Sequence, residues 1–304
     1  MANKEIKLNT ISPMFLTGAD TRTPDDLRAP SIRGQIRYWF RALEGANTPD
    51  IEELWKLEKK LLGSTSGGSQ VSVRFFKAPP DPFDEGKDVE RKAMLPHRSD
   101  PVERSLQKAI QIDTPFRLNL VTRPGVDVPP QVLNACAVWL LLGGLGKRSR
   151  RMFGAFNLTW AGKISTPQEL AKLINRYISA QIDLKKLKPM PNQPKFPMLH
   201  PSHSRIIVGT ESFDHEELVI DLFKGLLRTP KYLPFSKSFG YTTKDERRAS
   251  PVIAQARKIG EKYYPILTVM HSEPNGPINW SKVKEFMNDA STRWKCVEAW
   301  GEWR

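Results

Sequence analysis

Cysteine is scarce in this chain, which contains only Cys136 and Cys296 among 304 residues. Two cysteines make no disulfide framework, and no Cys/His cluster has the spacing of a zinc site. Long hydrophobic runs are also missing, because the longest, over residues 135–142, is too short to cross a bilayer. The N-terminal stretch MANKEIKLNTISP is polar and lacks the apolar core of a signal peptide. We therefore expect a cytoplasmic protein without membrane contact.

Negative charge is the second shortage. The chain has 47 Lys and Arg residues against 33 Asp and Glu residues, which gives a net charge of +14. The surfaces of thermophilic proteins are rich in both Lys and Glu, whereas in this chain the cations exceed the anions. An unbalanced positive charge of this size is typical of proteins that bind a polyanion, since cations neutralise phosphates. The composition therefore favours nucleic acid as the partner.

Hydrophobic periodicity predicts one order of elements for both halves of the chain. In the first half, the predicted strands are 5–16, 69–76, 116–123 and 156–162, and the predicted helices are 31–43, 51–63 and 129–145. In the second half, the predicted strands are 204–210, 250–260, 263–273 and 291–300, and the predicted helices are 214–227 and 278–289. This order predicts an α+β fold with two tandem ferredoxin-like (RRM-like, βαββαβ) repeats. A glycine-rich loop precedes the last strand of the first repeat.

The predicted domains follow from this order. Residues 1–163 form the first repeat with its glycine-rich loop, and residues 196–304 form the second repeat. Residues 164–195 contain a connecting helix, over 165–187, and the start of a proline-rich linker. Residues 78–105 are rich in proline, aspartate and charge, and we expect them to form a long exposed excursion.

The sequence GGLGKRSRRMFGAF, at 143–156, concentrates glycines and cations in one loop. Glycines allow backbone N–H groups to approach an anion, and Arg binds phosphate through two N–H groups at once. A dinucleotide fingerprint is excluded because these glycines follow a helix, and a P-loop is excluded because no Gly-Lys-Ser/Thr precedes a helix. A flexible basic surface loop is the alternative. The RNA-binding candidates here are Gly143, Gly144, Gly146, Lys147, Arg148, Arg150, Arg151 and Gly154.

A second basic row lies on the first predicted helix. Arg33, Arg37 and Arg41 are spaced four residues apart, beside the apolar stripe, and Arg22 and Arg28 lie just upstream. We expect these arginines to border the same groove as the glycine-rich loop. The alternative is an ordinary solvated helix face. Phe75 and Phe76 supply aromatic rings on a strand, but no RNP string is present, so base stacking on the sheet has weak support.

Catalytic signals are few. His200 and His203 are close in sequence, but no nearby carboxylate completes a metal site. His97 and Lys87 could move a 2′-hydroxyl proton in a metal-independent ribonuclease, although a solvated loop histidine is the ordinary reading. We expect no catalytic residue, no metal and no cofactor.

Several motifs resemble those of the RAMP superfamily of CRISPR proteins. They are LRAPSIRGQIRYWFRALEG at 27–45, LLGSTSGGSQVSVRF at 61–75, GGLGKRSRRMFG at 143–154, and RASPVIAQARK at 248–258 with YPILTVMHSE at 264–273. The first is similar to the N-terminal signature of one RAMP family, the first-numbered subunit of the type III-B (Cmr) effector complex. Met152 departs from the pattern, in which a small residue is frequent.

This resemblance implies a non-catalytic RNA-binding subunit in antiviral defence. Its partners would be guide RNA near the 3′ end, target RNA and other RAMP subunits of the Cmr complex. It places residues 143–154 and the arginines of the first helix toward RNA. Neither a GGDD nor an HD motif is present. The alternative is a RAMP endoribonuclease that processes guide RNA precursors. Such nucleases commonly carry a histidine in or beside the first helix, and residues 31–43 contain none.

Overall fold

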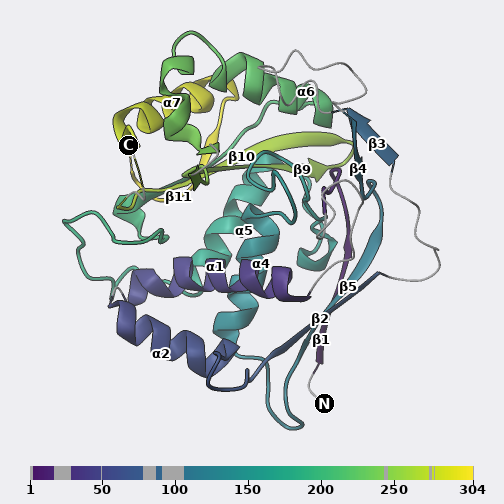
Figure 1. Cartoon of the computed structure of the whole chain (residues 1–304), viewed down its shortest axis with the longest axis vertical. Coiled ribbons are helices and arrows are strands. Elements are labelled where there is room, and N and C mark those ends of the chain that lie inside the picture. The colour runs from purple at the N-terminus through teal and green to yellow at the C-terminus, as the bar shows by residue number, and fades with distance from the viewer. Residues whose placement is uncertain are drawn as a thin grey trace.

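Two antiparallel sheets and the helices around them form a mixed α+β fold (Figure 1). The structure is a computed structural model that describes residues 3–16, 29–48, 50–77, 87–90, 106–242, 246–273, 276 and 278–303. Helices α1 (Ala29–Asn47), α4 (Pro130–Leu142) and α5 (Pro167–Ser179) lie between the sheets. Among these described residues, no helix is long and apolar enough to cross a membrane.

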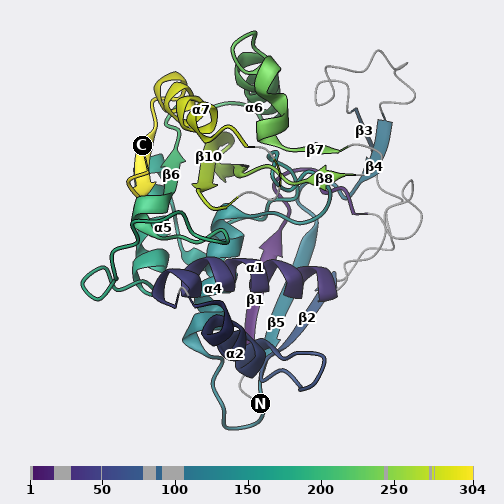
Figure 2. The same ribbon diagram turned by 60° about the vertical axis from the view of Figure 1, so that its left-hand side comes forward.

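The first sheet contains β1 (Asn3–Asn9), β5 (Pro115–Val121) and β2 (Ser72–Lys77), in the order β1-β5-β2. Its inner face packs against α1 and α4 (Figure 2). The apolar stripe predicted on the first helix is confirmed, because all five side chains are buried: Ile32, Ile36, Trp39, Phe40 and Leu43. Helix α2 (Ile51–Leu62) follows, with the Asp50 side chain capping its first turn.

The strand predicted over 156–162 is wrong. Phe156 forms one isolated bridge with Thr10, and Thr159–Ala161 then make a 3-10 helix. The Phe156 ring packs among Phe75, Phe116 and Trp139, at 6.0–6.1 Å between ring centroids. The apolar residue is therefore needed in the core, although the backbone around it leaves the sheet.

The second sheet contains β11 (Val297–Trp300), β6 (Ser204–Val208), β10 (Lys262–Met270) and β9 (Val252–Ile259), in that order. Helices α6 (His215–Ile220) and α7 (Trp280–Arg293) cover one face, and α5 and α4 cover the other (Figure 1). Every residue of β6 is buried, as in a strand that is covered on both faces.

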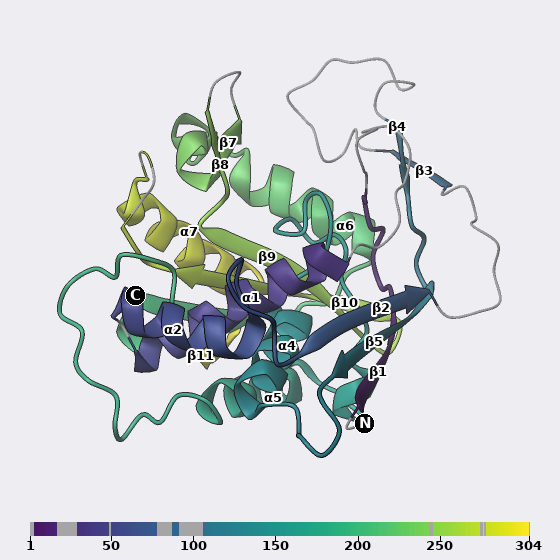
Figure 3. The same cartoon turned by 60° about the horizontal axis from the view of Figure 1, so that its bottom comes forward.

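Several predicted boundaries move. The helix predicted over 214–227 divides into α6 and a π-helix over Asp221–Leu227, and α5 ends eight residues before the predicted position. Short 3-10 helices cover Pro201–His203 and Leu233–Phe239. Two small hairpins complete the fold: β3 (Lys87–Glu90) with β4 (Leu106–Ala109), and β7 (Tyr241–Thr242) with β8 (Arg247–Arg248) (Figure 3). The rest of the predicted excursion at 78–105 lies outside the described residues.

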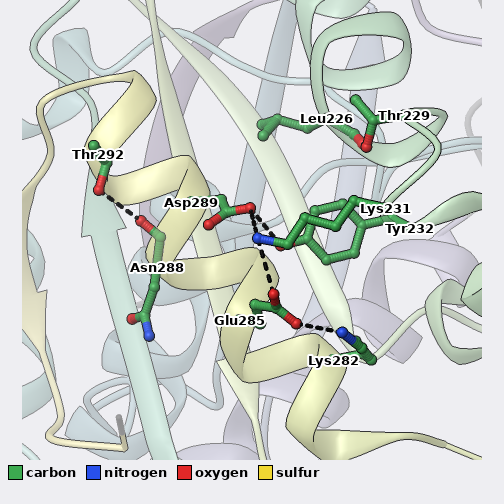
Figure 4. Close-up of polar contacts among 9 residues, drawn as sticks. All are labelled: Leu226, Thr229, Lys231, Tyr232, Lys282, Glu285, Asn288, Asp289 and Thr292. Atoms are coloured by element: carbon green, nitrogen blue, oxygen red, sulfur yellow. Dashed lines mark hydrogen bonds and ion pairs between the residues drawn. The ribbon is translucent and has the colours of Figure 1, made fainter.

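The turn after the π-helix is held to α7 by a polar network (Figure 4). The Lys231 ammonium lies 2.9 Å from Glu285 and 2.5 Å from Asp289, and the Tyr232 hydroxyl donates to Asp289 over 2.7 Å. The hydrogen bonds that the Lys231 ammonium donates to these two carboxylates raise the pKa of Lys231. The network fixes the position of the segment that leads toward β7.

Candidate nucleic-acid interface

The glycine-rich loop is an anchored element. On one side, Lys147 N–H donates to the Phe15 carbonyl over 2.8 Å and Gly154 N–H donates to the Pro13 carbonyl over 3.1 Å. On the other side, Ala254 of β9 donates to the Arg150 carbonyl and accepts from Met152 N–H. The loop is therefore clamped between the segment after β1 and the edge of the second sheet.

Each glycine of this loop stands where a side chain would collide with the protein. A Cβ at Gly154 would lie 1.9 Å from the Leu145 carbonyl oxygen, and one at Gly146 would lie 2.6 Å from the Phe15 carbonyl oxygen. Both glycines also have left-handed backbones, with φ of 67° and 87°. Close packing of the loop requires these glycines, so the case for a phosphate ligand rests on the cations.

Met152 has a left-handed backbone as well, with φ of 68°, which explains why a small residue suits this position. Its side chain is fully buried in the core cluster that includes Phe15 and Phe153. Its carbonyl accepts a hydrogen bond from His215 Nε2 over 2.8 Å. The methionine is therefore accommodated by packing rather than by free space.

The four cations of the loop have different surroundings. Arg151 is partly buried and donates to the carbonyls of Val252 and Phe239, so it joins the loop to the second half of the chain. Burial, with the neighbouring cations, lowers the pKa of Arg151 to about 10. Arg148 is partly exposed and Lys147 is exposed. Arg150 is partly exposed and donates to the Ser250 carbonyl over 2.6 Å.

A pocket of about 270 Å³ separates α1 from the glycine-rich loop. Gly34, Tyr38 and Arg41 line it from α1, at the spacing of one helix face. Arg150 lines it from the loop, and its guanidinium lies 5.1 Å from the centre of the Tyr38 ring. Gly34 has open space where a Cβ would stand. The structure thus brings the glycine-rich loop and the first helix together around this pocket.

The three arginines of the helix row do not share one environment. Arg37 donates to Glu58 Oε1 over 2.6 Å and to the carbonyls of Leu62 and Gly63, which directs it toward α2. Arg41 lines the pocket and lies 3.3 Å from Glu58 Oε2.

Arg33 is partly exposed, and its Nε is buried without a hydrogen-bond partner in the described part of the chain. Arg22 and Arg28 lie outside the described residues.

Sequence reasoning missed Tyr38, Gln35 and Ser149, which also line the pocket. A helical projection could have found Tyr38, since it lies four residues after Gly34 and three before Arg41. Ser149 carries no signal of its own, because only the fold of the loop brings it to the pocket.

None of the histidines in the described part of the chain lines this pocket. His200 and His203 are buried, and the His200 Nδ1 lies 2.7 Å from the Ser202 hydroxyl. His97 lies outside the described residues, and only the backbone of Lys87 is described, in β3. Within the described ranges, no group of three His, Cys, Asp or Glu residues is arranged to hold a metal ion.

The family model of the RAMP superfamily matches residues 7–157, a span that contains both walls of the pocket. The chain belongs to the RAMP superfamily. Within it, the chain is similar to the CRISPR system Cmr subunit Cmr1-1 of Pyrococcus furiosus, with 24% identity over 339 aligned positions that cover 99% of this chain and 98% of the relative. It is 44% identical to Cmr1-2 of that organism over 68 residues, which cover 22% of this chain and 36% of the relative.

Solved structures share the fold. The apo crystal structure of Cmr1 from Pyrococcus furiosus covers the whole of both chains with a TM-score of 0.69 and 22% identity. A chain of the type III-B Cmr-beta complex bound to cognate target RNA has a TM-score of 0.65 and 14% identity, and the match covers 95% of this chain and 98% of that one.

Proposed function

We propose that this chain is a non-catalytic RNA-binding subunit of a type III-B CRISPR effector complex in antiviral defence. It contacts guide RNA, in its 3′ region, or target RNA, or both, and it docks onto other RAMP subunits. The similarity to Cmr1 subunits supports this assignment, as does the fold shared with a chain of a Cmr complex that holds target RNA.

The observation that carries the proposal is that Arg150 and Arg41 line the same pocket, one from the loop and one from α1. Two guanidinium groups on opposite walls suit the phosphates of a chain that runs between α1 and the loop. Tyr38 adds a ring that a sugar or base can contact. Arg151 and Arg37 hold the two walls in place, since carbonyl groups, and for Arg37 also Glu58, occupy their guanidinium groups.

An endoribonuclease that processes guide RNA precursors is the alternative. None of the pocket-lining residues is a histidine, and the described histidines belong to other parts of the fold. We expect the purified protein to leave a guide precursor intact, with or without divalent metal.

We also propose that two ferredoxin-like units make up the chain, over 1–163 and 196–304, joined by 164–195. The order β11-β6-β10-β9 supports the second unit, because it corresponds to the βαββαβ order of strands. The first unit keeps three strands, with the bridge of Phe156 to Thr10 in place of the fourth.

The replacement Arg150→Gln tests the RNA site. We expect weaker binding to single-stranded RNA of any sequence, and a slope of log affinity against log salt that is smaller by about 0.7 for one lost phosphate contact. Fluorescence polarisation across a salt series measures both quantities.

Arg176→Gln is the matched control, because Arg176 is exposed on α5 with its guanidinium 5.3 Å from the Tyr177 ring. Equal affinities and slopes for the two variants and the wild type would contradict the RNA site. A thermal melt confirms that Arg150→Gln remains folded, since this residue also bonds Ser250.

A further inference from the structure

The outer face of the first sheet carries a row of side chains across its three strands. Lys7 of β1 pairs with Arg117 of β5, and Arg117 pairs with Phe76 of β2. Directly opposite residues in antiparallel strands point to the same face, with Cβ atoms about 4.5–5.5 Å apart. Helices α1 and α4 lie on the other face of this sheet (Figures 1 and 3).

Phe76 is unusual on this row because 49% of its side chain is exposed. Its neighbour Phe75 points the opposite way and is 9% exposed, within the core. The alternation of β2 explains the direction of Phe76, but core packing does not explain an aromatic residue there. An exposed ring on an open sheet is the arrangement on which RNA-binding sheets stack unpaired bases.

The charge around Phe76 distinguishes an RNA ligand from a protein ligand. Arg74 lies two residues from Phe76 on β2, and it pairs with Asn119 of β5, which in turn pairs with Glu5. The face therefore has three exposed cations, on Lys7, Arg74 and Arg117, and one exposed anion on Glu5. A ring between two guanidinium groups offers stacking and phosphate neutralisation together, which single-stranded nucleic acid requires.

We propose that this sheet face is a second site for single-stranded RNA, in which one unpaired base stacks on Phe76 and the flanking phosphates bind Arg117 and Arg74. The proposal rests on the proposed function in that the ligand is RNA. The site is separate from the pocket of Arg41 and Arg150, because that pocket lies between α1 and the loop, on the helix side of the sheet.

Phe76→Ala, Phe76→Trp and Arg150→Gln in the full chain test the site by fluorescence polarisation with labelled oligouridine. Phe76→Ala removes a half-exposed ring, so we expect the fold to persist and the affinity to fall about 5- to 150-fold, which corresponds to ~1–3 kcal/mol for one stacked base. Phe76→Trp keeps an aromatic face and should retain the affinity. Ultraviolet crosslinking to oligouridine that contains 5-iodouridine should label the peptide that contains Phe76.

Each outcome decides one proposal. An unchanged affinity in folded Phe76→Ala, together with a loss in Arg150→Gln, overturns the sheet site and leaves the pocket. A loss in Phe76→Ala with none in Arg150→Gln supports the sheet site and overturns the pocket. If Phe76→Ala binds RNA normally but no longer co-purifies with its neighbouring subunits, the face docks protein and the RNA proposal is wrong.

Discussion

The two sheets place their polar residues differently. In the first sheet, β5 alternates, with exposed Arg117 between buried Phe116 and Leu118. In the second sheet, β9 is buried along nearly its whole length, and fully buried Gln255 and Arg257 lie within it. One sheet therefore presents its cations to solvent, and the other uses a cation inside the protein.

The difference arises from the number of covered faces. Helices cover both faces of the second sheet, so a polar side chain there needs protein partners. Arg257 donates to the carbonyls of Leu140 and Gly143, at the end of α4, where a helix leaves carbonyls unpaired. Its burial lowers the pKa of Arg257 to about 9, still above neutral pH. The position of an arginine in the sequence therefore does not reveal whether it binds a ligand or the protein itself.

Replacing one arginine in each sheet tests this comparison most strongly. Arg257→Met leaves the carbonyls of Leu140 and Gly143 without this donor, and we expect the free energy of unfolding to fall by about 2–6 kcal/mol, at about 1–3 kcal/mol for each buried carbonyl left unpaired. Arg117→Met changes an exposed residue, so its effect should stay within about 0.5 kcal/mol. Urea denaturation followed by circular dichroism measures both, and similar losses for the two variants would contradict the comparison.

Arg37 sharpens the comparison, because it belongs to the first half but has the surroundings of a structural arginine. Arg37→Met removes the closest partner of buried Glu58 and the donor to Leu62, and we expect a loss of about 1–3 kcal/mol in stability. Its RNA affinity should fall less than that of Arg150→Gln. Arg176→Met, at an exposed position, is the control for stability. If Arg37→Met keeps its melting temperature but loses RNA affinity, Arg37 binds RNA and is not a structural residue.

Glu44 tests the comparison from the side of the anions, as a buried acid in the first half. Burial raises the pKa of Glu44 to about 7 from 4.5, and Gln181 donates to its Oε1 over 2.6 Å. The folded state then binds the extra proton between these values, so the free energy of unfolding should fall as pH rises from about 4.5 to 7.

The Glu44→Gln variant isolates this contribution. The difference in the free energy of unfolding between wild type and variant should change by on the order of 1–3 kcal/mol across that pH range. Burial holds the pKa of His271 near 4, so this residue makes the free energy of unfolding rise with pH. The contribution is the same in wild type and variant and therefore cancels from the difference. A difference that stays constant with pH would show that Glu44 titrates at its ordinary value.

The sequence predicts the α+β class and both principal helices of the first half correctly, because strong apolar periodicity follows burial. It fails at 156–162, because Phe156 is an apolar residue that packs in the core without belonging to a strand. It also groups Arg37 with Arg41, because their regular spacing shows that they lie on one helix face. The spacing does not show that α2 packs beside Arg37 and binds its guanidinium group. Phe76 is ambiguous in sequence, since only the open side of the sheet distinguishes it from Phe75.

The anchoring of the glycine-rich loop has a consequence for the order of events during synthesis. Arg150 bonds Ser250, which lies 100 residues later in the chain. A ribosome that adds about 5–20 residues per second needs about 5–20 s to produce that partner. Throughout this interval the pocket wall lacks its support from β9, although the residues of α1 and α4 have already been synthesised. The pocket between α1 and the glycine-rich loop is therefore completed late, when the C-terminal half has emerged and folded against the loop.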